Sequence, residues 1–195
     1  MTTPAPEFDF TPRMPEVDVP PDLEARFATA RRIASGDEPA GAGELAPGQR
    51  RLVIVTPGRM FMLQRCPLPG SMGLDAVAAI EKIAPASTPQ RIAVIAFTEL
   101  RALRANLGKA IPFAGYLLGL AYVGHHVVIF EGHPSALREG CRDADLLIVD
   151  GAMIPTLQPD WLTVAWSVMR APHAVVFGRD GTVKRISKKE RDAGH

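Results

Sequence analysis

The chain has few of the residues that mark several special classes of protein. It has two cysteines, Cys66 and Cys141, in 195 residues. Two cysteines give no disulfide framework, and their separation is not that of a metal site, so a reducing cytoplasm is the simplest location. The formal net charge is only +1. Because nucleic-acid binding needs clustered Lys and Arg, we expect no specific nucleic-acid partner.

Signals for secretion or membrane insertion are also lacking. The stretch "MTTPAPEFDFTPRMPEVDVPP" has neither a basic nor an apolar region, so it is not a secretory signal. Residues 111–130 carry no formal charge and are long enough to span a bilayer, but Pro112, three glycines and a His-His pair interrupt them. We therefore expect a buried helix followed by a buried strand rather than a membrane span.

Motifs of the commonest α/β enzymes are missing. No G-x-G-x-x-G follows a predicted strand, and "NLGKAIP" has a Gly-Lys pair without a phosphate-binding loop. Neither G-x-S-x-G nor H-E-x-x-H occurs. His125 and His126 would open a strand, where neighbours alternate faces, so we expect no metal pair there.

What the chain does contain is an α/β pattern. From residue 51 onward, apolar strands alternate with helical segments, and the mostly apolar segments at 91–97, 126–130, 145–149 and 174–177 are typical of parallel strands buried on both faces. Pro57-Gly58 joins two short runs, a hairpin or a bent strand pair, and Asp180-Gly181 predicts a closing hairpin. We predict one three-layer, Rossmann-like or flavodoxin-like domain over 51–187, with a mostly parallel sheet, an antiparallel C-terminal edge hairpin and a solvated tail at 188–195.

Residues 1–50 differ from the rest, with eight of the 18 prolines. Within this arm, the spacing of the apolar residues predicts an amphipathic helix over about residues 22–35. Leu23 and Phe27 lie on its apolar face and Arg31 on the other. Two interpretations are open. The helix packs on its own domain, or it is a partner-binding element on a flexible tether, bound through these three residues.

Polar residues follow the predicted strands at the edge where α/β sheets bind ligands. The ligand-binding candidates are Glu99, Glu131, His133, Asp150 and Arg179. Carboxylates, an imidazole and a guanidinium at one edge would suit acid–base chemistry or recognition of a polar ligand. The alternative is that they are ordinary strand-end and turn residues, with His133 capping a short helix that begins at Pro134.

Residues 91–155 resemble a receiver domain of the flavodoxin-like type. "RIAVIAF", "GHHVVIFEG" and "ADLLIVDGAMIP" correspond to its first three strands, and Asp150 to its phosphoacceptor. The acids that hold Mg²⁺ in receivers are replaced by Ala96 and Phe97. The resemblance therefore implies a degenerate, receiver-like domain without the phosphorylation chemistry.

The same region is similar to cobalamin-binding domains. "NLGKAIPFAGYLLGLAYVGHHVVIF" matches that family's Gly-Lys, helix, glycine and strand. The family's Asp and ligand His would fall on Leu103 and Ala105, so this resemblance implies a Rossmann-like domain without its cobalt ligand.

Three functional hypotheses follow. The first is a non-catalytic regulatory, accessory or scaffold protein that acts through a protein partner or a homo-oligomer, because the fold is well formed and catalytic signatures are missing. The alternative is a small-ligand-binding protein or enzyme that uses the acidic residues and His133 at the strand ends. The third is a cobalamin or nucleotide carrier; on the first hypothesis the chain needs no cofactor.

Overall fold

A computed structural model gives the fold of this chain. It describes residues 22–37, 52–56, 60–63, 81–84, 88–96, 116–117, 119–121, 123–178 and 182–186. Its elements are α1 (Leu23–Ser35), β1 (Leu52–Val55), β2 (Met60–Leu63), β3 (Arg91–Ile95), β4 (His126–Phe130), α5 (Pro134–Cys141), β5 (Leu146–Asp150), the 3₁₀ helix η2 (Gly151–Thr156), α6 (Trp161–Val168), β6 (Ala174–Phe177) and β7 (Val183–Ile186).

The strands form one seven-stranded sheet in the order β2-β1-β4-β3-β5-β6-β7. The inner strands β1, β4, β3, β5 and β6 run parallel, and β2 and β7 pair antiparallel at the two edges. The predicted α/β class and its C-terminal edge hairpin are therefore confirmed. Of the two options for the Pro57-Gly58 region, the flanking strands pair as a hairpin. The order β4-β3-β5-β6 is the one that flavodoxin-like sheets use.

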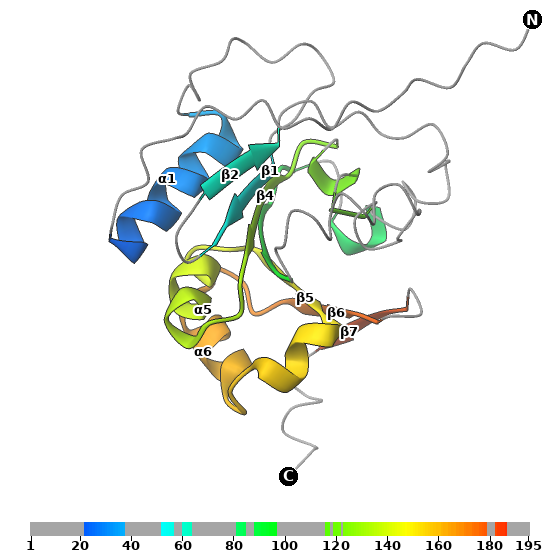
Figure 1. Cartoon of the computed structure of the whole chain (residues 1–195). Coiled ribbons are helices and arrows are strands. Elements are labelled where there is room, and N and C mark those ends of the chain that lie inside the picture. The colour runs from blue at the N-terminus through cyan, green and yellow to red at the C-terminus, as the bar shows by residue number, and fades with distance from the viewer. Residues whose placement is uncertain are drawn as a thin grey trace, which may run out of the picture.

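Every inner strand buries side chains on both faces of the sheet, because helical segments cover both faces. Val53, Val128, Ala93 and Leu147 face the layer that holds α1, α5 and α6, which lie on the same side in Figure 1. Their neighbours in the strands face the other side, where Leu117, Leu120 and Ala121 pack. The continuous apolar runs of the sequence thus correspond to doubly covered parallel strands.

Helix α1 belongs to the first of these layers. The Asp22 Oδ2 atom accepts a hydrogen bond of 2.8 Å from the Ala25 N–H at its start, and Gly36 ends it with φ of 85°. Phe27 is 1% exposed, and its ring meets the Phe130 ring of β4 edge-on at 5.5 Å. The predicted helix is present, and its apolar face packs in the core of its own domain.

Helix α5 connects β4 to β5 and begins as predicted, with Pro134 in its first turn. Gly140 lies inside the helix. A Cβ atom there would come within 2.6 Å of the Phe130 ring, so the glycine permits close packing of helix on strand. The residue with positive φ after the helix is Asp143, at 58°.

Candidate functional site

Two of the predicted site residues meet at the carboxyl ends of β1 and β4. A cavity of about 220 Å³ opens there between α1 and the start of α5, and we call it the carboxyl-edge cavity. Its lining combines an apolar floor with a polar rim. The lining residues are Leu23, Phe27, Val55, Thr56, Glu131, His133, Ser135 and Ala136. Concave, mostly apolar sites with a few convergent polar groups are the usual form of a small-ligand site.

The polar rim contains a hydroxyl–imidazole pair. The His133 Nδ1 atom and the Ser135 Oγ atom are 2.7 Å apart, which is hydrogen-bonding distance. Either the hydroxyl donates to Nδ1 or a protonated Nδ1 donates to the hydroxyl. Ser135 was missed by the sequence-based prediction, although a hydroxyl two residues after His133 in the first turn of a predicted helix was the available signal.

The start of α5 adds a second polar feature to this cavity. His133 occupies the N-cap position, as predicted, but its side chain makes no capping hydrogen bond. Its carbonyl oxygen accepts the Leu137 N–H at 2.7 Å, which is the first hydrogen bond of the helix. The earlier N–H groups of a helix have no partner within the helix and carry partial positive charge. Ser135 and Ala136 supply these groups at the cavity.

Asp150 lies apart from this cavity and has a local structural role. It ends β5, and its Oδ1 atom accepts the Ala152 N–H at 3.0 Å, which begins η2. Between Asp150 and the carboxyl-edge cavity, η2 folds back over the sheet edge. A Cβ atom on Gly132 would come within 2.7 Å of Leu157 and 3.2 Å of Met153, so these side chains pack closely against the residue after β4. Glu131 and His133 line the carboxyl-edge cavity, whereas Asp150 is not among its lining residues.

Apolar packing is also found where the strand order reverses, between β3 and β5. Ala96 follows β3 there and is buried, as is Met153 from η2. Two buried apolar side chains, those of Ala96 and Met153, thus lie near this point. A receiver-like domain without the phosphorylation chemistry stays a prediction.

The remaining sequence candidates have other outcomes. Glu99 and Arg179 lie outside the described residues, as do Leu103 and Ala105 of the cobalamin resemblance. Among the residues proposed to bind a partner, Leu23 lines the carboxyl-edge cavity and Phe27 is buried in the core. Arg31 Nη1 donates a hydrogen bond of 2.9 Å to the Glu139 carbonyl oxygen of α5. These three residues of α1 therefore contact the domain of their own chain.

The described part of the chain contains neither a cluster of metal ligands nor a helix that could span a membrane. Within those ranges no three His, Cys, Asp or Glu side chains gather as metal ligands would. In the same ranges no helix has the length and apolar character needed to cross a membrane. Cys141 is fully buried at the end of α5, and burial raises the pKa of its thiol above the usual range. Cys141 is therefore part of the core.

Comparison of the chain with models of protein families, with curated proteins and with solved structures finds no match. The resemblances to receiver and cobalamin-binding domains stay predictions from the sequence. We therefore infer a function from the geometry of the described residues.

Proposed function

We propose that the chain is a small-ligand-binding protein whose ligand occupies the carboxyl-edge cavity. The observation that carries this proposal is the meeting of Glu131, His133 and Ser135 with an apolar floor formed by α1 and β1. Ligands of α/β proteins bind at this edge of the sheet. A ligand placed there would bury an apolar part against Leu23 and Phe27 and direct its polar groups to the rim.

The rim defines the chemistry of the ligand. The Glu131 carboxylate accepts hydrogen bonds and attracts a cation, whereas the first-turn N–H groups of α5 attract an anion. The Ser135 hydroxyl can do both. A small amphipathic molecule with a donor and an acceptor beside an apolar group, such as an apolar amino acid, satisfies all of these features. The cavity volume of about 220 Å³ suits a molecule of that size rather than a dinucleotide.

The proposal concerns binding and not catalysis. A serine nucleophile needs a base, a third group that orients the base, and donors for the developing oxyanion. The contact between His133 and Ser135 joins residues two apart at a helix start, so helix initiation accounts for it without catalysis. Partner binding through the arm stays a prediction for residues 1–21 and 38–50, which are outside the described ranges. The apolar face of α1 is already used within the domain.

The test is a thermal-shift screen with a panel of metabolites that includes apolar amino acids, their amines and their carboxylates. We expect a compound with both polar groups to raise the melting temperature of the wild-type chain. Glu131→Gln and Ser135→Ala should each weaken binding by about tenfold, the cost of one hydrogen bond to a charged group.

The matched control is Ser167→Ala, because the Ser167 hydroxyl donates to the Val164 carbonyl within α6, away from the cavity. This variant should bind as the wild type does. A panel without any stabilising compound would contradict the proposal. So would hits whose affinity is unchanged in both cavity variants.

A further inference from the structure

A second cavity lies at the opposite edge of the sheet, where the parallel strands begin. Its volume is also about 220 Å³, far above the roughly 15 Å³ that a single water needs. The second half of α1, the starts of β3 and β4 and the end of α5 surround it. We call it the amino-edge cavity, and its polar lining residues are Arg31, Arg32, Ser35, Asp37, Arg91, His126 and Arg142.

This lining is strongly unbalanced in charge. Four arginines line the cavity, and Asp37 is the acidic residue among its lining. Asp37 already accepts a hydrogen bond from the Ser35 hydroxyl through Oδ2. The other carboxylates nearby also have partners, because Glu139 binds Arg142 through both oxygens, at 2.6 and 2.8 Å. Asp145 Oδ1 lies 3.5 Å from Arg170, and its Oδ2 accepts the Arg91 backbone N–H.

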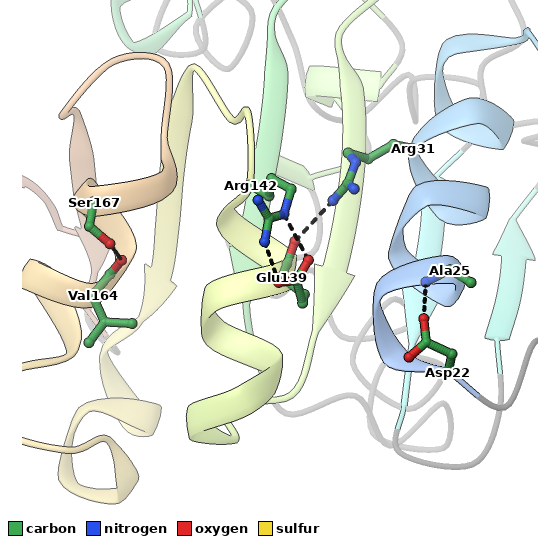
Figure 2. A network of polar contacts seen from close by, with 7 residues as sticks. All are labelled: Asp22, Ala25, Arg31, Glu139, Arg142, Val164 and Ser167. Atoms are coloured by element: carbon green, nitrogen blue, oxygen red, sulfur yellow. Dashed lines mark hydrogen bonds and ion pairs between the residues drawn. The ribbon is translucent and has the colours of Figure 1, made fainter.

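Two of the arginines are therefore without a carboxylate of their own. The Arg31 guanidinium reaches across from α1 to α5, where it donates to a carbonyl oxygen rather than to an acid (Figure 2). Among the described residues, no carboxylate lies within 4.0 Å of the Arg31 or Arg91 guanidinium. Burial lowers the pKa of Arg31, and the charges of Asp143 and Glu139 offset that effect only in part. A half-buried cation in this state is stabilised by an added anion.

His126 adds an imidazole to the same cavity. It is the first residue of β4, and it pairs in register with Arg91, the first residue of β3. Burial and then the Arg91 charge lower its pKa, while Asp37 and Asp145 oppose the shift. The ring is therefore neutral at pH 7, with one nitrogen to donate and one to accept a hydrogen bond.

From this geometry we infer that the amino-edge cavity binds the phosphate group of a small molecule. A phosphate offers three peripheral oxygens and up to two negative charges, so several guanidiniums can bind it at once, often through two parallel hydrogen bonds each. A carboxylate has two oxygens and one charge and uses fewer of these donors. The site is distinct from the carboxyl-edge cavity and does not depend on the function proposed for it.

The experiment uses inorganic phosphate as the probe, with the full chain at constant ionic strength. We expect phosphate to raise the melting temperature more than acetate or chloride does. Arg91→Gln should weaken phosphate binding by about tenfold or more, since a hydrogen bond to a charged group is lost. Arg138→Gln makes the same change of charge on α5 but is exposed and outside the lining, so it should bind phosphate as the wild type does.

A titration of the wild-type chain followed by amide NMR keeps the test independent of how the variants fold. Phosphate should shift amide signals of residues 31–37, 91–93 and 142–144, which surround the cavity. An equal loss of affinity in Arg91→Gln and Arg138→Gln would overturn the proposal, as would shifts confined to other regions. Stabilisation by acetate as large as that by phosphate would overturn the assignment to a phosphate group.

Discussion

The imidazole of His125 joins three segments of the domain, and its protonation should control stability. The side chain is 1% exposed. Its Nδ1 atom accepts the Gln90 N–H at 3.0 Å, just before β3, and its Nε2 atom lies 3.0 Å from the Ala84 carbonyl oxygen. A carbonyl can only accept, so Nε2 carries the proton and Nδ1 does not. The folded state therefore requires the neutral ring in one tautomer.

The pH dependence follows from that requirement. Burial lowers the pKa of His125 below the ordinary value of 6.5, and the hydrogen bond to Ala84 opposes this shift only in part. Below pH 6.5 the unfolded chain binds a proton at this residue before the folded chain does. The stabilisation is therefore complete above pH 6.5 and is lost as the pH falls toward the folded pKa. The slope is about 1.4 kcal/mol per pH unit for one group.

His125→Phe tests the size of this contribution. The phenyl ring keeps most of the volume but leaves the Ala84 carbonyl and the Gln90 N–H without their partner. At about 1–3 kcal/mol for each buried unsatisfied group, the free energy of unfolding should fall by about 2–6 kcal/mol. His173→Phe is the matched control, because His173 is exposed, and it should change stability by less than about 0.5 kcal/mol.

The assay is urea unfolding followed by circular dichroism at about pH 7.5 and pH 5.5. The wild type and His173→Phe should lose stability between these two values. His125→Phe should lose about 1.4 kcal/mol less than the wild type between these pH values. Some loss should remain in His125→Phe, because burial also lowers the pKa of His126. The same pH dependence in His125→Phe and wild type would refute the assignment of a buried neutral imidazole.

Two further predictions concern the packing of helices on β4. Gly140→Ala improves helix propensity, but its Cβ atom would meet the Phe130 ring, so we expect a net loss of about 1–3 kcal/mol in urea unfolding. That loss should shrink in a Phe130→Leu background, and an unchanged loss there would contradict the steric cause. Phe27→Ala should lower the free energy of unfolding by about 3–5 kcal/mol, because the ring is in the domain core. A variant as stable as the wild type would show that α1 contributes little to the core.

Much of the fold could be predicted because the parallel strands are buried on both faces. Runs such as residues 92–95 and 127–130 are continuously apolar, and few other elements of that length have this pattern. The order of strands was harder, since β3 lies between β4 and β5 although it precedes both in the chain. The sequence did not determine whether α1 packs on its own domain. An amphipathic helix has the same periodicity whether it covers its own sheet or another protein.

The site was predicted only where local sequence determines it. Glu131 and His133 share a cavity because both follow β4, so one strand end positions them together. Asp150 follows β5, which is separated from β4 by β3, and η2 packs in the space between. The turn that forms η2 depends on a side chain capping its own backbone, and "DGAMIP" did not distinguish it from an active-site loop.

The directions of α1 and α5 explain why the two cavities differ in character. Both helices run from the carboxyl edge of the sheet, at Leu23 and His133, to the amino edge, at Arg31 and Arg142. Their positive ends therefore lie at one edge and their negative ends at the other. Arg31 at the negative end of α5 is stabilised by a carbonyl oxygen, which carries only partial charge.

Arg31 could act as a cap of α5, as a ligand of the anion, or as both, and a stability measurement with and without phosphate distinguishes these roles. If Arg31 only caps α5, Arg31→Gln lowers stability by the same amount with and without phosphate. If it also binds the anion, the loss is larger in phosphate, because the ligand stabilises the wild type more than the variant. Arg91 has no hydrogen bond from its guanidinium to any described residue, so Arg91→Gln removes no helix cap and should act mainly on the phosphate-dependent part. The two variants together distinguish a helix cap from an anion site at the amino edge.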